Sequence, residues 1–444
     1  MLKKKTISLD SRFSLPEKTT VVHHKGKILI IASECANYIV LENDKQLNFY
    51  NLLQTLTLGE ALKESATDTK TAQAVLVQIE AKKFENKIIP HSNGRLQMHL
   101  FLTNKCNLRC KHCYMLSGDK YDKELTYDEI CSLLKAFSLH GGEFVTFSGG
   151  EVTTRKDFLE ILKEAHGLGL HINIMTNGTL WDNEMIEKAS TFVESVQISI
   201  DGFNETENAK VRGSGHFDKS LQTADLFLRH NIRTTIAITP WPDENLTSHI
   251  EHYVQFKHRL LAKYQGFPLE IKFTEELMDG RDLKTTSELR NDYSQTMKKI
   301  SSVGHENMEE DIFVYNQERK ILKDSWCTYG HLTITATGEV YFCGKIQLTK
   351  SVGNIREMDL PTVMNLSKKA RELAKTQSLH PCGQCELKYI CGGGCRILHF
   401  PQFADNRNVY LSSDSTNTHS RECDASLKGH YYDLMIQANK RLYK

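Results

Sequence analysis

The chain of 444 residues carries almost no net charge, because 56 Lys and Arg are balanced by 55 Asp and Glu to leave +1. Such a chain has no global field that would gather nucleic acid or an anionic membrane, so local sites must select its partners. It also lacks any run of ~18 apolar residues, and no apolar stretch of signal-peptide length follows the lysines near its start. These absences predict a cytoplasmic protein that binds neither nucleic acid nor membrane.

Internal repeats and long low-complexity segments are absent as well. The length is sufficient for two or three domains with sizeable cores. In residues 1–90, strand-like alternation comes first and helical spacing follows, which predicts a small α+β module. The breaker residues Pro90, Asn93 and Gly94 then predict a linker.

Residues 96–275 show a different rhythm, in which six apolar runs of strand length alternate with helical segments. One of these helices opens with Thr126 and Glu129 in the spacing of a capping box. Strands that alternate with helices indicate a parallel sheet built from βαβ units. Because βαβ connections are right-handed, the pattern predicts an α/β fold with a partial (β/α)6 TIM-like barrel, whose active site lies at the carboxyl ends of the strands.

The chain changes character again after the sixth strand. Residues 276–325 are expected to form a bridging helical region, and residues 326–444 a cysteine-rich domain that begins with a hairpin turning at Thr337-Gly338. The twelve cysteines occur in a large chain without an export signal, so metal ligation is favoured over disulfides. Ten of them fall into two groups, and only Cys35 and Cys131 stand alone.

The first cysteine group directly follows the first barrel strand. Cys106, Cys110 and Cys113 have the spacing C-x3-C-x2-C. Three thiolates in a short loop can each hold one corner of a cubane iron–sulfur cluster and leave the fourth iron open to another ligand. A zinc site is the alternative, but zinc needs a fourth ligand. His112 lies between two of the cysteines and would strain to reach the same ion.

This triad, at the end of the first strand of a βα barrel, resembles the signature of the radical S-adenosylmethionine (SAM) superfamily. The resemblance covers about residues 96 to 275. It implies that SAM chelates the open iron of a [4Fe-4S] cluster, and that an electron from the reduced cluster splits SAM into a 5′-deoxyadenosyl radical, which abstracts hydrogen from the substrate. An external one-electron reductant of the flavodoxin or ferredoxin type is implied with it.

Residues after three later strands agree with this resemblance. Gly149 and Gly150 lack side chains, so their backbone can approach the methionine end of SAM, and Glu151 can meet its ammonium. The alternative for each motif is an ordinary turn or a surface ion pair. The resemblance implies further contacts with the ribose, carboxylate and adenine of SAM from Asn177, Ser199, Arg212 and His112, with Asp201 at the same rim.

The second group holds seven cysteines, and its spacing resembles the SPASM domain, which adds auxiliary [4Fe-4S] clusters to radical SAM enzymes. Zinc ribbons are the alternative, but seven cysteines do not divide into complete sets of four. The ligands that the resemblance implies for one cluster are Cys382, Cys385, Cys391 and Cys423. Those that it implies for the other cluster are Cys327, Cys343 and Cys395.

The second of these clusters has only three cysteines. Enzymes with two fully ligated auxiliary clusters carry an additional cysteine shortly before the first of the seven, and residues 318–326 contain none. We therefore expect an open iron there, unless Cys35 or Cys131 supplies the ligand. Cys131 lies in an apolar helical pattern that is typical of a core residue. Gly280-Arg281, a dipeptide frequent in related SPASM enzymes, is interpreted as structural.

SPASM enzymes mostly act on peptides or proteins. The N-terminal module loosely resembles the small winged-helix-like domains (PqqD-like, or RRE) that bind leader peptides by adding the leader as a strand to an exposed sheet edge. This resemblance implies an enzyme that installs a thioether or carbon–carbon crosslink in a ribosomally made precursor peptide. A purely structural cap is the alternative for the module.

Two other functions remain open at this point. Anaerobic sulfatase-maturating enzymes, which make formylglycine, have an Asp directly after the cysteine that corresponds to Cys343, whereas this chain has Gly344. A non-enzymatic iron–sulfur redox or binding protein would keep the cysteines but would not need Glu151, Ser199 and Arg212 around SAM.

Overall fold

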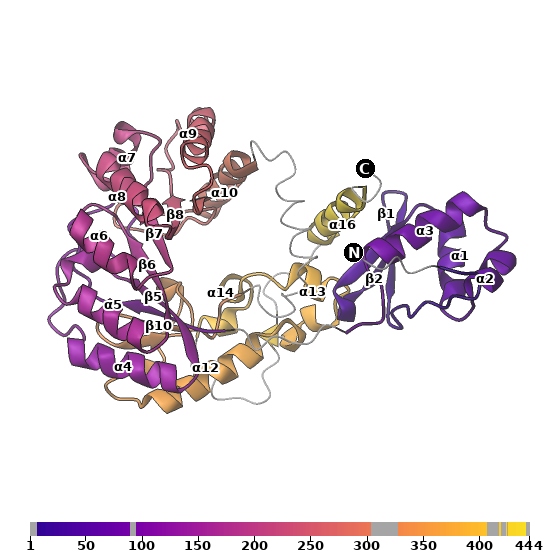
Figure 1. Cartoon of the computed structure of the whole chain (residues 1–444), viewed down its shortest axis with the longest axis horizontal. Coiled ribbons are helices and arrows are strands. Elements are labelled where there is room, and N and C mark those ends of the chain that lie inside the picture. The colour runs from indigo at the N-terminus through magenta and orange to yellow at the C-terminus, as the bar shows by residue number, and fades with distance from the viewer. Residues whose placement is uncertain are drawn as a thin grey trace.

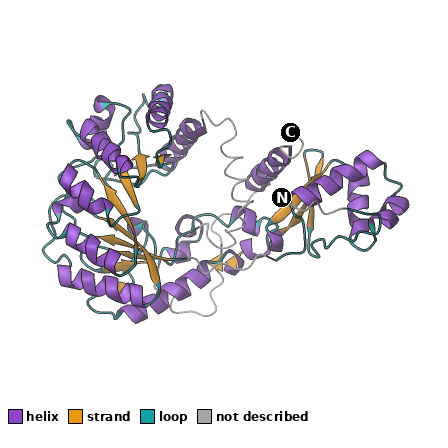
Figure 2. Ribbon diagram, in the orientation of Figure 1, coloured by secondary structure: helices purple, strands orange, loops and turns teal. Residues whose placement is uncertain are grey.

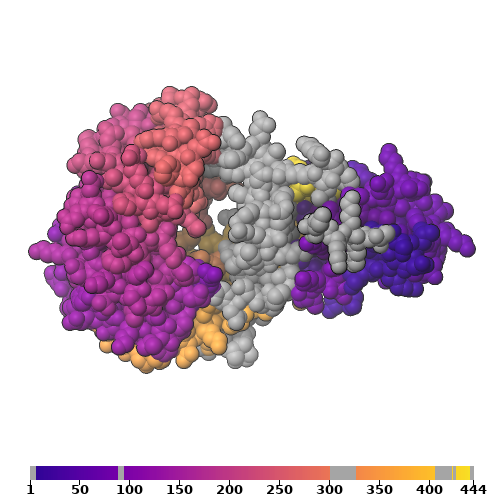
Figure 3. Space-filling model, in the orientation of Figure 1, coloured from indigo at the N-terminus to yellow at the C-terminus, as the bar shows by residue number. Residues whose placement is uncertain are grey.

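The computed structural model describes residues 7–88, 95–302, 327–405, 417–418, 423 and 425–440. An N-terminal module and a barrel lie at opposite ends of an elongated molecule (Figures 1 and 3). Helical segments of the cysteine-rich region, labelled α13 (Lys388–Cys391), α14 (Arg396–His399) and α16 (Ala425–Lys440) in Figure 1, lie between them and are drawn in the same orientation in Figure 2. The linker predicted around Pro90 falls outside the described residues.

The N-terminal module consists of a three-stranded antiparallel sheet followed by three helices. The strands are β1 (Thr20–His24), β2 (Lys27–Ala32) and β3 (Asn37–Leu41), in that order across the sheet. The helices are α1 (Asp44–Leu53), α2 (Leu58–Ser65) and α3 (Thr69–Ala81). The predicted sequence of strands before helices is confirmed, although α2 was not predicted.

Both faces of this small sheet are buried, and each covers a different part of the molecule. On one face, Ile28, Ile30 and Ile39 pack under the module's own helices. Residues of the opposite face form a separate core with the C-terminal region, made by Leu29, Ile31, Tyr38 and Val40 together with Leu387, Ile390 and Met435. Because side chains alternate along a strand, this double burial explains why β2 is apolar at every position after Lys27. The module is therefore packed onto the cysteine-rich region.

The barrel has six parallel strands in chain order, each followed by at least one helix. Its strands are β4 (Leu96–Phe101), β5 (Gly142–Ser148), β6 (His171–Thr176), β7 (Ser195–Ser199), β8 (Arg233–Ile238) and β9 (Leu269–Phe273). Its helices are α4 (Tyr127–Leu139), α5 (Phe158–Gly167), α6 (Asn183–Ser190), α7 (Glu205–Arg212), α8 (Phe217–Arg229), α9 (Ile250–Lys263) and α10 (Ser287–Ser302). The predicted capping box of α4 is present, since Thr126 and Glu129 bond each other's backbone N–H groups. The partial (β/α)6 barrel is confirmed.

The sheet does not end at the barrel. The predicted hairpin forms from β10 (Leu332–Ile334) and β11 (Glu339–Tyr341), and Gly338 supplies the positive φ of +89° at its turn. β10 pairs in parallel with β4, and β12 (Gly353–Asn354) completes a sheet of nine strands. The cysteine-rich region is thus joined to the barrel at the strand that leads into the cysteine triad, which the sequence pattern did not predict.

The rest of the described C-terminal region is built from short elements. They are η3 (Ile346–Leu348), α12 (Leu360–Ala374), η4 (Thr376–Ser378), β13 (Leu379–His380), η5 (Cys382–Gln384), α13 (Lys388–Cys391), α14 (Arg396–His399), η6 (Pro401–Phe403), β14 (Asn417–Thr418) and α16 (Ala425–Lys440). Within the ranges that the structure describes, no helix is long and apolar enough to cross a membrane.

Candidate active site

The triad loop leaves the carboxyl end of β4 and is closed at its base. Cys106 N–H donates to the Gly118 carbonyl oxygen at 2.8 Å, and Cys113 N–H donates to the Cys110 carbonyl oxygen at 3.2 Å. Burial, together with the nearby charges of Glu151, Cys110 and Cys113, raises the pKa of Cys106 to about 11. The three thiols therefore lie close together, and cationic iron is the partner that would stabilise their thiolate forms.

The Gly149–Glu151 turn is packed directly against the segment that enters the triad loop. Gly150 N–H donates to the Thr103 carbonyl oxygen at 2.7 Å, and Glu151 N–H donates to the Lys105 carbonyl oxygen at 2.9 Å. A Cβ on Gly150 would lie 2.6 Å from the Asn104 carbonyl oxygen. The backbone of the triad loop therefore lies too close to these positions for any residue larger than glycine.

The carboxylate of Glu151 is buried and takes hydrogen bonds from within the barrel. Thr176 Oγ1 and the Asn177 N–H each donate to it at 2.7 Å, and Thr153 Oγ1 donates at 2.8 Å. Burial raises the pKa of Glu151, while these donors act in the opposite direction. The carboxylate therefore ties the end of β6 to the turn after β5. Its contact with the SAM ammonium stays a prediction.

Asn177 connects β6 to the triad loop through a residue that the sequence analysis did not single out. Asn177 Nδ2 donates to Asn107 Oδ1 at 2.9 Å, and Asn107 Nδ2 donates to Thr179 Oγ1 at 2.8 Å. Asn107 lies between Cys106 and Cys110, so the bond fixes the loop from inside the triad. An amide between two metal ligands is a signal that could have identified it.

A buried cluster of charges supports the other side of the triad. Asp201, after β7, lies 2.6 Å from Arg212 Nε and accepts a hydrogen bond from His112 Nε2 at 2.8 Å. Although burial alone would raise it, the charges of Arg212 and His112 hold the pKa of Asp201 at about 2. Arg212 Nη1 in turn lies 3.8 Å from Cys110 Sγ. Asp201, only a rim candidate from sequence, is thus the centre of this cluster.

The remaining predicted SAM contacts lie around the same rim. Ser199 is half-buried at the end of β7, two residues before Asp201. Gly280, by contrast, packs against the triad loop, where an added Cβ would lie 2.6 Å from the His112 carbonyl oxygen. Arg281 Nη2 donates to the Ser117 carbonyl oxygen at 2.5 Å. The Gly280-Arg281 segment therefore packs against the triad loop and supports it, in keeping with the structural interpretation of this dipeptide.

The four cysteines implied for one auxiliary cluster are brought together. They line a single small cavity whose walls also include Leu387 and Lys388. Burial, together with the nearby Cys391 and Cys423, raises the pKa of Cys382 to about 11. We call this site the distal site, because it faces the N-terminal module; its cysteines are Cys382, Cys385, Cys391 and Cys423.

The three cysteines of the other set, called here the proximal site, also lie near one another. Burial raises the pKa of Cys343 to about 12, with Cys327 and Cys395 adding to the shift. Cys35 packs in the core of the N-terminal module, and Cys131 lies on α4. Neither Cys35 nor Cys131 contributes to the pKa shift of Cys343.

The spacing of these thiols bears on the zinc alternative. Among the described residues, no three His, Cys, Asp or Glu side chains are placed to share one metal ion. A cubane carries each thiolate on a different iron, so its ligands lie farther apart than those of a single ion. All ten cysteines of the two groups thus have donor chemistry and grouping that fit iron–sulfur clusters.

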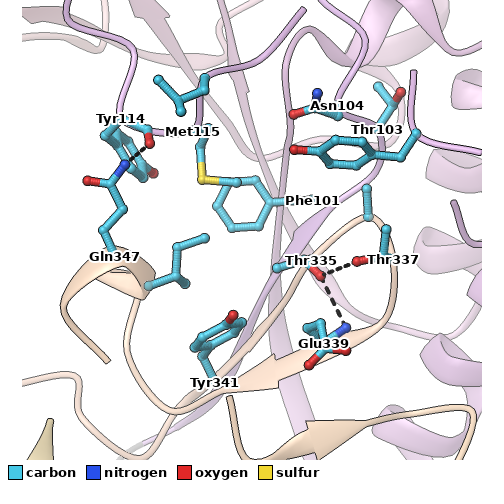
Figure 4. Close-up of a pocket in the computed structure, with 14 residues that line it drawn as sticks. Phe101, Thr103, Asn104, Tyr114, Met115, Thr335, Thr337, Glu339, Tyr341 and Gln347 are labelled. Carbon is cyan, nitrogen blue, oxygen red and sulfur yellow. Dashed lines mark hydrogen bonds between the residues drawn. The ribbon is translucent and has the colours of Figure 1, made fainter. Parts of the chain in front are cut away.

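A cavity of about 430 Å³ opens between the triad loop and the hairpin (Figure 4). Tyr114 and Met115 come from the loop just after Cys113, and Thr335 and Tyr341 come from the hairpin. Gln347 bridges the two sides, because its Nε2 donates to the Tyr114 carbonyl oxygen. The pairing of β10 with β4 therefore creates a cavity next to the triad loop, and its walls mix aromatic, aliphatic and polar side chains.

Comparison with known proteins agrees with this geometry. Residues 100–256 match the family model of the radical SAM superfamily, and residues 326–386 match that of the SPASM iron–sulfur cluster-binding domain. The chain therefore contains a radical SAM domain followed by a SPASM domain, which is the domain composition of a radical SAM enzyme. Its cofactors are SAM and [4Fe-4S] clusters. These two domains favour an enzyme over the non-enzymatic alternative.

Two curated relatives are similar over much of this enzyme. The sporulation killing factor maturation protein SkfB of Bacillus subtilis is 28% identical over 246 residues, which are 51% of this chain and 59% of SkfB. The chain thus spans less than two thirds of that relative. An AdoMet-dependent heme synthase of Methanosarcina barkeri is 26% identical over 331 residues, which are 68% of this chain and 92% of the synthase.

Two solved structures share the fold. The anSMEcpe structure with bound AdoMet has a TM-score of 0.56 and 17% identity, and the match covers 79% of this chain and 94% of that one. Streptococcus suis SuiB bound to S-adenosylmethionine has a TM-score of 0.50 and 16% identity over 87% of this chain and 96% of that one. Residues 96–444 make up about 79% of the enzyme, so the match to SuiB extends into the N-terminal module.

The close approach at Gly150 leads to the first prediction. Gly150→Ala forces the Asn104–Lys105 backbone away, at a local cost of about 1–3 kcal/mol. We expect weaker loading of the SAM-binding cluster, measured as the electron paramagnetic resonance signal that responds to added SAM. Gly167→Ala is the matched control, since its added Cβ meets no atom within 4 Å. Equal loading of the two variants would contradict the proposed packing role.

The second prediction concerns the buried charges. Asp201→Asn leaves Arg212 buried without its carboxylate, so the free energy of unfolding of the cluster-free chain at pH 7 should fall by about 3–5 kcal/mol. Because the folded pKa of Asp201 is lowered to about 2, this stabilisation is present at neutral pH. It is lost as the pH falls from about 4, the pKa of an unfolded Asp, through about 2.

Denaturant unfolding at pH 7, 4 and 3 measures the difference between wild type and variant. Glu194→Gln is the control, because Glu194 pairs with His171 on the surface, where removal of a pair changes stability by less than about 1 kcal/mol. A difference for Asp201→Asn that is as small as that of the control, or that grows toward pH 3, would show that the buried pair does not stabilise the fold.

Proposed function

We propose that this enzyme modifies a ribosomally made precursor peptide and installs a thioether or carbon–carbon crosslink in it. The observation that carries the proposal is an N-terminal sheet that is packed onto the SPASM region and has an edge to which no other described strand is paired. SkfB is named as a maturation protein, and SuiB has been solved with its precursor peptide SuiA. These relatives support a peptide as substrate.

The open edge is that of β1. A two-residue turn at Lys25-Gly26 makes His24 and Lys27 a hydrogen-bonded pair, so the N–H groups of Val21 and His23 point away from β2. At the other edge, Val40 N–H and carbonyl oxygen are already bonded to the Gln78 side chain at 2.8 and 2.6 Å. We therefore assign β1 as the edge to which a leader strand adds.

The reacting part of the peptide is assigned to the cavity beside the triad. Its apolar lining residues, among them Phe101, Met115 and Tyr341, suit an apolar side chain, and it adjoins both the triad loop and the hairpin that precedes Cys343. When bound, the SAM-binding cluster and SAM supply hydrogen abstraction by a carbon-centred radical. The chain's own contribution is to exclude water and to hold the peptide between the triad and the proximal site.

Each site residue has a proposed role. Cys106, Cys110 and Cys113 hold the SAM-binding cluster, and the proximal and distal sites hold two auxiliary clusters. Asn177 and Asp201 position the triad loop through Asn107, His112 and Arg212. SAM itself is assigned to the rim formed by Gly149, Gly150, Glu151, Asn177, Ser199, Arg212 and His112.

The surroundings of the enzyme follow from this chemistry. Reduction of a cluster needs a one-electron donor, and we propose a flavodoxin or ferredoxin type protein in the cytoplasm. The proximal site has three cysteines, and residues 318–326, which lack a cysteine, lie outside the described residues. An open iron at this site remains part of the proposal.

Formylglycine formation is the second candidate, and the fold shared with anSMEcpe favours it. Against it, Gly344 follows Cys343, where a sulfatase-maturating enzyme has an Asp. A Cβ on Gly344 would meet no atom within 4 Å, so packing leaves room for a side chain that the chain does not provide. Turnover of a sulfatase-motif peptide would favour this candidate over crosslinking.

The third prediction separates radical generation from crosslinking. Replacing Cys106, Cys110 and Cys113 together with Ala should abolish cleavage of SAM, because no thiolate remains to hold the SAM-binding cluster. Cys385→Ala, at the distal site, should lower product formation more than SAM cleavage. Chromatography of 5′-deoxyadenosine measures SAM cleavage, and mass spectrometry of a candidate precursor peptide measures product formation. Retained SAM cleavage in the triple variant would overturn the assignment of the triad.

The fourth prediction tests the open edge. Val21→Pro removes an outward N–H without breaking a bond to β2, so strand addition should weaken while the module stays folded. We expect at least a tenfold loss of precursor-peptide affinity, measured by fluorescence anisotropy. Val21→Thr keeps the N–H and is the control. Equal affinity of both variants for a peptide that binds wild type would show that β1 is not the edge used.

A further inference from the structure

Arg396 is a fully buried cation in the SPASM region. It directly follows Cys395, begins α14, and is 1% exposed. No carboxylate among the described residues forms an ion pair with it, although other buried cations of the enzyme, such as Arg212, have one. A buried charge without a counter-charge is costly, so this guanidinium requires compensation from another source.

Its hydrogen bonds show that its place is fixed. Arg396 Nε donates to the Ala374 carbonyl oxygen at 2.8 Å, and Nη1 donates to the Gly392 carbonyl oxygen at 2.9 Å and to the Gly394 carbonyl oxygen. Nη2 lies 3.4 Å from Thr376 Oγ1. Neutral carbonyls satisfy the donors but leave the full positive charge in place.

The charge lies between the two auxiliary sites. Gly392–Gly394 is the stretch that joins Cys391 of the distal site to Cys395 of the proximal site. A Cβ built on Gly393 would lie 3.5 Å from Arg396 Nη1 and 3.5 Å from Cys382 Sγ, so these two atoms border the same small space. The charges of Cys327, Cys382, Cys395 and Cys391 all oppose the effect of burial, which lowers the pKa of Arg396.

We propose that Arg396 is a positioning residue whose permanent positive charge is compensated by the thiolate-ligated clusters of both auxiliary sites, and that it thereby raises the reduction potential of both. A cluster gains one negative charge when it accepts an electron, so a cation held nearby stabilises the reduced form. The guanidinium remains charged at any working pH, so its effect on the reduction potentials of the two sites does not change with pH.

The experiment uses the full chain with Cys106, Cys110 and Cys113 replaced by Ala, so that only auxiliary clusters remain after reconstitution with iron and sulfide. Redox titration with dithionite, followed by electron paramagnetic resonance, gives their midpoint potentials. Arg396→Met should disfavour reduction at both sites by about tenfold, which is about 59 mV for a one-electron couple. Arg396→Lys, which keeps the charge, should shift them much less.

Arg155→Met is the matched control. Arg155 is a largely buried arginine that bonds the Leu102 and Leu125 carbonyl oxygens in the barrel, so its loss should leave the auxiliary potentials unchanged. Unchanged potentials in Arg396→Met, or equal shifts in Met and Lys variants, would overturn the proposal. If Arg396→Met fails to take up iron, the iron contents of Arg396→Lys and Arg396→Gln are compared instead. Iron uptake by Arg396→Lys but not by Arg396→Gln supports the role of the charge. Any other pattern overturns the proposal.

Discussion

The active site depends on a close packing of backbone around the triad loop. The segment before Cys106 lies against Gly150, and the loop itself lies against Gly280, at distances where a Cβ would collide with a carbonyl oxygen. Three chain segments far apart in the sequence therefore meet through main-chain atoms, with no side chain between them at the two glycines. Placing three thiols for one cluster requires this precision, because a loop held only by side chains would leave their relative positions free.

Buried charge is the second constraint, and the enzyme meets it in two ways. In the barrel, Asp201 balances Arg212 and His112 within the protein itself. In the SPASM region, Arg396 has no such partner among the described residues and stands between cysteines that would bind iron as thiolates. The buried charges of the barrel should therefore be compensated before any cofactor binds. The charge of Arg396 in the SPASM region should be compensated only once the clusters are bound.

Much of this could be predicted from the sequence, and the rest could not for physical reasons. Cysteine spacing and the strand–helix rhythm indicated the barrel and the triad, because both reflect local chain geometry. The docking of β10 beside β4 was not predictable, since a strand's own pattern does not specify which edge it joins. Likewise, the sequence placed Glu151 near SAM, but only the structure shows its carboxylate bonded to Thr176 and Asn177.

The same edge pairing connects the proposed steps of the reaction. Because β10 extends the barrel sheet, Cys343, just after β11, is held on the same sheet as the strand that leads into Cys106. The N-terminal sheet then packs on Leu387 and Ile390, which flank the distal site. Module, distal site, proximal site and triad are thus joined by continuous packing. A leader strand held at the module would be fixed relative to the cavity, so the length of peptide between leader and crosslink should govern which residues react.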